Sequence, residues 1–304
     1  MCFLGLHRQG FSDILIYQNK NRDTRRNGGF VSKTISAAKP TTKTGREYHL
    51  HTAPGDLSPL CLAVGAPGRA DMIARQYFAP GSQRFINRKR GLVARTGIYK
   101  GIRMSVFTTG MGGASTGIAL PEAVRTGARI IIRVGSCGSL LPKSKPGDPI
   151  VVTAAVRFDG ASHIWAPPEF PAAADYRVVA ALMNAGKKVW AKNPHLGIEA
   201  TTDDFYNGQG RPDLNDEISP AMLTRHAEML RLGVGCYSME AATLFTWCAT
   251  QGKGLPSRAI NAVYAQRITN EFKATGDELV SEIALEALLL LAKDRSLDGF
   301  INRP

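Results

Sequence analysis

The sequence has few cysteines and no motif that pairs them. Its 304 residues include five Cys, and no C-x-x-C occurs among them. An odd number without that spacing indicates neither a disulfide scaffold nor a zinc site, so we predict no metal site. The same usage is typical of a reducing compartment, and we expect a cytoplasmic protein.

Long apolar runs are also missing. The stretch Ala287–Ala292 is far too short to cross a bilayer, and we predict no membrane span. Neither G-x-x-x-x-G-K-[ST] nor G-x-G-x-x-G occurs, so the sequence gives no support for those nucleotide-binding loops. We find no internal repeat.

Acidic residues are fewer than basic ones, and the imbalance is concentrated near the N-terminus. The net charge is +13, and residues 1–48 hold nine Lys or Arg against three acids. Residues 1–47 are polar and rich in Ser and Thr, which predicts a basic, disordered tail. An organellar transit peptide is the alternative, which Asp13 and Asp23 disfavour. The rest of the chain has no long basic run and no RNA-binding motif, which favours a small anionic substrate over nucleic acid.

What the chain does contain is a series of strands that end in glycine-rich segments. Leu60–Val64 is followed by a Gly-Ala-Pro-Gly turn and Arg69, and residues 103–109 are followed by Gly-Met-Gly-Gly-Ala-Ser. Glycines let backbone N–H groups approach an anion, and an arginine adds a bidentate clamp. Because several such strand ends meet at one edge of a sheet, we expect a single anion pocket there.

The strongest of these segments runs from residue 129 to residue 139. Ile130–Ile132 are β-branched and do not alternate with polar residues, which predicts a strand buried on both faces. Arg133 follows at once, and we interpret Gly135, Ser136 and Gly138 as a tight turn that offers donors to a ligand. The alternative is a structural Arg133 paired with an internal carboxylate.

Two later segments have the chemistry of a nucleoside site. Phe205, Gln209 and Arg211 lie in a glycine loop after a predicted strand at 196–202. The Gln209 amide and the Arg211 guanidinium match the carbonyl, N–H, carbonyl edge of a pyrimidine-2,4-dione, and Phe205 could stack on the ring. Glu240 opens a helix that runs to about residue 250, where its carboxylate could accept hydrogen bonds from two vicinal hydroxyls or merely cap the helix. His163, in an aromatic and Pro-rich loop, is a further catalytic candidate, although a surface role is the commoner one.

From about Tyr48 to Ala292 the chain resembles the nucleoside phosphorylase I family, and within it the uridine phosphorylases. The matching segments are GAPGR (65–69), TGMGGAS (109–115), RVGSCG (133–138), FDGAS (158–162), FYNGQGR (205–211) and MEAATL (239–244). The resemblance implies a single-domain, three-layer α/β/α sandwich with a mixed, barrel-like central sheet. The domain would span residues 48–296, between the basic tail and a C-terminal tail at 297–304.

The resemblance also implies roles for individual residues. Phosphate would be bound by Gly65, Arg69, Arg133 and Ser136, together with Arg90 from a neighbouring subunit. Ribose would contact Met239, Glu240 and a His49 sent across the dimer interface. The base would contact Phe205, Gln209, Arg211 and Arg267. Arg211, Gln209, Arg133 and Glu240 would carry the catalysis, and the assembly would be a hexamer built from dimers.

The chain departs from the family pattern at three positions. Where the purine branch carries an Asp after the last strand, this chain reads Ala265-Gln266-Arg267, so the acid for purine cleavage is missing. Gly91 replaces a Glu that helps bacterial uridine phosphorylases to hold potassium, and the resemblance therefore does not carry that ion over. Ser238 replaces another Glu just before Met239.

The expected activity is reversible phosphorolysis of uridine to uracil and ribose 1-phosphate in pyrimidine salvage, with inorganic phosphate as co-substrate and no cofactor. The alternatives are a purine nucleoside phosphorylase, a nucleosidase that uses water, a basic RNA-binding protein, and a non-catalytic nucleoside sensor on the same fold. The sequence does not separate uridine from thymidine or deoxyuridine.

Overall fold

The computed structural model describes residues 35–302, with the side chains of residues 87–89 excepted. Residues 40–304 form one compact unit, which contains the predicted catalytic domain. Residues 1–34 of the predicted basic tail, and with them most of the transit-peptide alternative, lie outside the described residues.

Strands and helices alternate along most of this unit. The strands are β1 (Leu60–Val64), β2 (Arg84–Lys89), β3 (Leu92–Tyr99), β4 (Ile102–Thr108), β5 (Ile130–Ser139), β6 (Pro149–Phe158), β7 (Ala172–Ala173), β8 (His195–Thr202), β9 (Cys236–Ser238), β10 (Ser257–Gln266) and β11 (Glu271–Phe272). The helices are α2 (Pro67–Tyr77), α3 (Gly112–Arg125), α4 (Gly160–His163), α5 (Tyr176–Trp190), α6 (Pro220–Arg231), α7 (Ala241–Thr250), α8 (Asp277–Leu291) and α9 (Asp298–Ile301), with short 3-10 turns η1 (Asn207–Gln209) and η2 (Arg295–Leu297).

All of these strands belong to one mixed sheet. Its order is β11-β10-β6-β8-β9-β5-β1-β4-β3-β2, and β7 pairs with β6. β10 also pairs in parallel with β5, which closes β5, β10, β6, β8 and β9 into a barrel. Closing the sheet provides hydrogen-bond partners for backbone N–H and C=O groups that would otherwise be unpaired on exposed edge strands. The predicted mixed, barrel-like sheet is confirmed.

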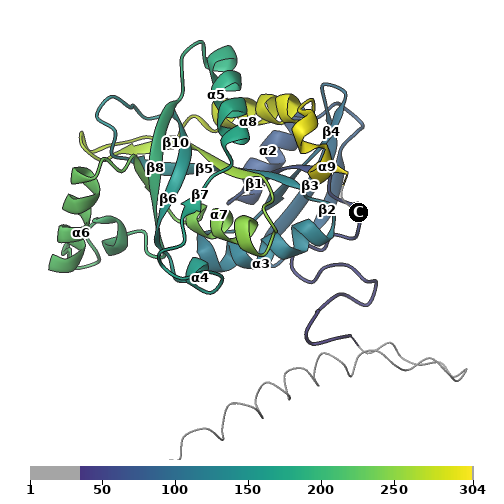
Figure 1. Cartoon of the computed structure of the whole chain (residues 1–304), viewed down its shortest axis with the longest axis horizontal. Helices are drawn as coiled ribbons and strands as arrows, with labels where there is room; N and C mark the ends of the chain where they lie inside the picture. The colour runs from purple at the N-terminus through teal and green to yellow at the C-terminus, as the bar shows by residue number, and fades with distance from the viewer. Residues whose placement is uncertain (1–34, 303–304) are drawn as a thin grey trace, which may run out of the picture. The chain divides into compact units, whose positions relative to one another are not determined.

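Helices cover the sheet on two sides, as Figure 1 shows. α2, α5 and α8 lie on one side, and α3, α4 and α7 lie on the other. Ile130 and Ile132 pack with the first group, whereas Ile131 packs with the second. The prediction of a strand buried on both faces is therefore confirmed for the start of β5.

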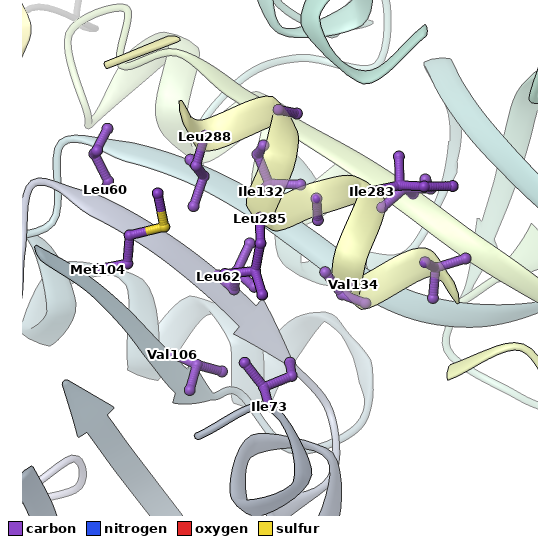
Figure 2. Packing of buried hydrophobic residues seen from close by; sticks show 14 of the residues in the cluster. Leu60, Leu62, Ile73, Met104, Val106, Ile132, Val134, Ile283, Leu285 and Leu288 are labelled. Carbon is purple, nitrogen blue, oxygen red and sulfur yellow. The ribbon is translucent and has the colours of Figure 1, made fainter. Parts of the chain in front are cut away.

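The larger core lies between α8 and the strands beside β5. Figure 2 shows apolar side chains of several elements meeting there. They are Leu60 and Leu62 of β1, Met104 and Val106 of β4, Ile132 and Val134 of β5, and Ile283, Leu285 and Leu288 of α8, with Ile73 of α2 beside them. Each such side chain contributes roughly 2 kcal/mol when it is fully buried. This packing fixes the carboxyl ends of β1 and β5 next to each other.

Two local predictions are wrong. The segment that we interpreted as a tight turn, Gly135–Ser139, continues β5 as an extended strand. Its residues pair with β10 and β9, because Gly135 lies opposite Asn261 and Gly138 lies opposite Tyr237. The spacing of Thr275 and Glu278 also predicts a capping box, formed by residues 275–278, at the start of the last helix. No such box forms, since α8 begins after Gly276, whose φ of +93° suits glycine and whose side chain cannot cap.

Candidate active site

A cavity of about 870 Å³ lies beside the carboxyl ends of β1, β4 and β5 and is bounded by β9 and β10. Every residue to which the family resemblance assigns a role, except Arg267, lines it. These residues are His49, Gly65, Arg69, Arg90, Arg133, Ser136, Phe205, Gln209, Arg211, Met239 and Glu240. The structure thus brings together residues that are up to about 190 positions apart in the sequence.

Arg69 lies in the first turn of α2, after the turn at Gly65. Its Nη1 donates to the carbonyl of Val134 at 3.0 Å, and its Nη2 donates to Asp277 at 2.7 Å and to the Tyr264 hydroxyl at 2.9 Å. Its Nε is buried and has no hydrogen-bond partner among the described residues. The guanidinium is therefore fixed against the cavity wall with one donor unsatisfied.

Arg133 lies on β5 at the centre of the wall. Its Nη2 pairs with Oε2 of Glu240, and its Nη1 donates to Oδ1 of Asn261 at 3.1 Å. Its Nε also lacks a partner within the part of the chain that the structure describes. The alternative prediction, an Arg133 paired with an internal carboxylate, is therefore correct. That carboxylate, however, also lines the cavity, so the pair belongs to the site.

The glycines of β5 give these arginines room. A Cβ built on Gly135 would overlap Nη1 of Arg133 and Oδ1 of Asn261. A Cβ on Gly138 would lie 3.1 Å from Nη2 of Arg211 and 3.3 Å from Cγ of Arg267. The glycines thus leave space for neighbouring side chains and do not form a turn.

Glu240 lies between Arg133 and the start of α7. It immediately precedes that helix, but its side chain makes no capping hydrogen bond. Its Oε1 accepts from the backbone N–H of Gly112 at 2.9 Å, and its Oε2 accepts from the Ser238 hydroxyl at 3.2 Å. The purely capping alternative is therefore wrong, and the carboxylate faces the cavity beside Met239.

His49 and Arg90 complete this part of the wall. Nδ1 of His49 lies 2.7 Å from Oε1 of Glu122, which also accepts from the backbone of His49 and Leu50. Arg90 is exposed, and its guanidinium lies 5.3 Å from the ring centre of Tyr48. Both residues come from outside the barrel.

The predicted base-binding residues lie together around η1. Nη1 of Arg211 donates to Oε1 of Gln209 at 2.5 Å and to the carbonyl of Phe205 at 2.8 Å. The Arg211 guanidinium also stacks on the Phe205 ring, 4.0 Å from its centre. Arg267 donates to the carbonyls of Gln209 and Gly210, both at 2.9 Å, and so supports the loop from behind.

This end of the cavity is positively charged. Burial, together with the neighbouring Arg267, lowers the pKa of Arg211 to about 10. Burial also lowers the pKa of Arg267. Among the described residues neither arginine forms an ion pair with a carboxylate, so the pair favours an anionic group next to it.

Sequence reasoning missed several residues of the wall. Tyr264, Asp277, Tyr237, Phe272 and Met111 also line the cavity. Tyr237 and Met111 adjoin predicted site residues or segments and could have been included on that ground. Asp277 was assigned to the capping box, and only the approach of α8 to α2 shows that it contacts Arg69. His163 does not line the cavity, and its Nε2 lies 3.1 Å from the carbonyl of Arg157.

Two negative findings apply to the described part of the chain. It contains no group of three or more His, Cys, Asp or Glu that could hold a metal ion. None of its helices is long and apolar enough to span a membrane.

Comparison with known proteins gives closely related sequences over most of the chain. A uridine phosphorylase of Thermococcus kodakarensis is 39% identical over 263 residues, which cover 86% of this chain and 93% of that protein. A uridine phosphorylase of Haemophilus influenzae is 34% identical over 255 residues, or 81% and 98% of the two chains. A DeoD-type purine nucleoside phosphorylase of Jannaschia is 30% identical over 244 residues, or 79% and 97%.

The family model that describes the phosphorylase superfamily matches residues 59–292. This range extends from just before β1 to just after α8 and holds most of the cavity wall. The match, together with relatives of at least 30% identity over most of their length, shows that the chain belongs to the phosphorylase superfamily.

Proposed function

We propose that this protein is a uridine phosphorylase, a pentosyltransferase that converts uridine and phosphate reversibly into uracil and ribose 1-phosphate. The single observation that carries the proposal is the order of groups in one cavity. All of these groups line the cavity, in two clusters along β5. Arg133 pairs with Glu240, and Arg69 donates to the carbonyl of Val134. Gln209 and Arg211 contact each other farther along the strand, where Arg211 lies next to Gly138. Anion, sugar and base can therefore be bound side by side.

At the phosphate end, Arg69 and Arg133 would hold the oxyanion with Gly65, Ser136 and Arg90. Two buried arginine Nε–H groups without partners among the described residues support an anion there, because an unsatisfied buried donor is costly. Glu240, with Met239 and His49, would bind ribose hydroxyls. As the C1′–N1 bond breaks, positive charge develops on the ribose, and the bound phosphate would offset it and then attack C1′.

At the base end, negative charge develops on the departing uracil. Gln209 and Arg211 would stabilise that charge at the carbonyls and N3, with Arg267 behind them. Donors placed where charge develops are each worth roughly 3–4 kcal/mol. Phe205 would stack on the base with the ring face that Arg211 does not cover. The proposed steps use no covalent enzyme intermediate and no cofactor.

We propose further that the enzyme is a cytoplasmic homo-oligomer, a hexamer built from dimers, in which Arg90 and His49 complete the site of a neighbouring subunit. In the single chain both residues line its own cavity from segments outside the barrel, and Arg90 is exposed. An interface formed on this side of the chain would also bring them next to a neighbour's cavity. These positions suit a contribution across an interface.

A purine nucleoside phosphorylase is the second candidate, since one relative of that kind is 30% identical. The segment Ala265-Gln266-Arg267 stands where that branch carries an Asp, and the amide of Gln266 donates to the carbonyls of Leu141 and Ser144, at 2.8 and 2.9 Å. That amide is thus engaged away from the cavity, and the position supplies no proton to a purine.

A substrate panel tests the proposal. Uridine, thymidine, deoxyuridine and inosine are incubated with and without inorganic phosphate, and the release of base is followed. We expect uracil release that requires phosphate, and no cleavage of inosine. Brisk inosine cleavage would overturn the assignment to the uridine branch, and phosphate-independent uracil release would indicate a nucleosidase. Uridine binding without turnover would indicate a sensor.

A further inference from the structure

A buried carboxylate that the proposed mechanism does not use lies directly behind the cavity wall. Glu199 of β8 has no exposed surface and does not line the cavity. Its Oε1 accepts from the Thr201 hydroxyl at 2.9 Å and from the backbone N–H of Ala241 at 3.1 Å. Its Oε2 accepts from Nδ2 of Asn261 at 2.9 Å. Three donors thus satisfy it, although burial raises its pKa, Arg133 opposes the rise and Glu240 adds to it.

The first consequence concerns Arg133. Asn261 has one amide with an acceptor side and a donor side, and the carboxylate of Glu199 can only accept. The donor Nδ2 must therefore face Glu199, which leaves Oδ1 to accept from Nη1 of Arg133. Glu199 thereby selects the amide orientation that holds Arg133 in the cavity wall.

The second consequence concerns Glu240. This residue precedes α7 without capping it, yet the first N–H groups of a helix need acceptors. They find them on β8, because Ala241 donates to Glu199 and Ala242 donates to Thr201 at 3.0 Å. The cap is thus supplied from the neighbouring strand, and the carboxylate of Glu240 is left to face the cavity.

We infer that Glu199 is a positioning residue of the active site, which orients Arg133 through Asn261 and releases Glu240 by capping α7 in its place. The inference rests on the proposed function, because Arg133 and Glu240, which Glu199 would position, are the residues that would bind phosphate and ribose in that reaction. Glu199 itself does not touch the substrates.

The test moves the carboxylate from position 199 to its hydrogen-bond partner at position 261. In Glu199→Gln the new amide N–H₂ group would face the Nδ2 donor of Asn261. The Asn261 amide is therefore expected to turn over, and Arg133 then loses Oδ1 as its acceptor. We expect kcat/KM for phosphate to fall about 10- to 100-fold, as small misplacements do, with a melting temperature close to that of the wild type. Adding Asn261→Asp supplies a carboxylate that can accept from both Arg133 and Gln at 199, and most of the lost activity should return.

Two controls accompany the exchange. Asn261→Asp alone places two carboxylates against each other and should be impaired as well. Glu286→Gln removes another buried carboxylate, one that lies away from the cavity and pairs with lysines, and should leave kcat/KM unchanged. A merely structural role for Glu199 predicts a lower melting temperature and no recovery in the double variant.

Full activity of Glu199→Gln, or a folded double variant that is no more active than the single one, would overturn the inference. If the single variant is insoluble, the double variant decides by itself, since it must be both folded and active. Calorimetric titration of the same proteins with inorganic phosphate measures how Glu199 affects phosphate affinity, and it needs no nucleoside. Loss and recovery of phosphate affinity there would support Glu199 even if the wild type does not cleave uridine, so the two failures are distinguishable.

Discussion

The arginines of the cavity differ in what balances their charge. Arg69 is paired with Asp277 and Arg133 with Glu240. Arg211 instead donates to the neutral groups of Gln209 and Phe205. An arginine that no carboxylate neutralises interacts more strongly with a negative charge that develops during the reaction. Arg211 is therefore the residue that we expect to act on the departing base.

Arg211→Ala tests this role. We expect kcat for uridine to fall about 10²- to 10³-fold, as with the loss of a donor at a developing charge, while inosine stays unreactive. The matched control is Arg225→Ala, because Arg225 also stacks on an aromatic ring, that of Phe158 at 4.4 Å, but does not line the cavity. Steady-state kinetics with both variants check the prediction. Equal activity of the two would contradict it.

At the scale of elements, β5 combines the core and the site in one strand. Its first residues fill both hydrophobic clusters, and its later residues carry Arg133 and the glycines beside it. Gly135 lies two positions after Arg133, on the same side of the strand, because side chains alternate along a strand. A glycine there lets the long side chain fold back over the backbone.

We therefore expect alanine at Gly135 and at Gly138 to have unequal effects. Gly135→Ala must displace both Arg133 and Asn261, and activity should fall more than about 100-fold, since a misplaced binding group can cost that much. Gly138→Ala meets the end of the Arg211 side chain and Cγ and Cδ of Arg267 at 3.1 to 3.4 Å, and a loss of roughly tenfold is expected from modest overpacking. Kinetics and melting curves of both folded variants provide the measurement. A Gly135→Ala enzyme with wild-type activity would contradict the account.

A second element-scale prediction concerns stability. Burial alone would raise the pKa of Glu286 on α8, but hydrogen bonds from Lys100, Lys188 and Tyr99 outweigh it and lower the pKa to about 2. A depressed carboxyl pKa stabilises the fold above its unfolded value of about 4.5, and this contribution is lost as the pH falls toward 2. Both lysines are largely exposed, so the contribution is only about 1 kcal/mol.

Melting temperatures of the wild type and Glu286→Gln at several pH values measure this effect. The variant should melt about 2–4 °C lower at pH 7, and the difference should shrink as the pH falls below 4.5. A difference that grows toward low pH would have the wrong sign for a depressed carboxyl pKa.

The sequence predicted the elements better than their side-chain environments. β1 begins and ends where its apolar run placed it, and β8 begins only one residue before the predicted strand at 196–202, because local sequence patterns determine them. Gly135 and Asp277 were misinterpreted, because a glycine required by a distant asparagine looks the same as one required by a turn. Glu199 and Asn261 gave no local signal, since their partners lie on other strands. The twelve predicted site residues came from strand-end chemistry and from the family resemblance, and their roles stay predictions.

At the scale of the whole molecule, the segment before β1 is tied to α3. Glu47 pairs with Arg125 at 2.7 Å, and the buried Glu122 accepts from the backbone and side chain of His49. Residues from 40 onward belong to the compact unit. We propose that the catalytic domain spans residues 48–296, and that these contacts hold His49 at the cavity.

Two truncations test that proposal. A chain that begins at residue 40 should keep its kcat/KM and melting temperature, because the contacts of Glu47 and His49 remain. A chain that begins at residue 52 loses both and leaves Glu122 buried without those donors. It should melt roughly 5 °C lower and lose most of its activity. The two melting curves and the uridine kinetics provide the comparison, and equal behaviour of both chains would contradict the proposed role of the segment.

The central claim is that one cavity holds an inorganic oxyanion and a nucleoside together, so that phosphate attacks the sugar. The most direct measurement is the product balance of uridine cleavage in phosphate buffer, with uracil measured by absorbance and the phosphorus species by ³¹P NMR. The account predicts one ribose 1-phosphate for each uracil released, and uridine synthesis when these two products are supplied alone. Release of uracil with free ribose and no consumption of phosphate would contradict it.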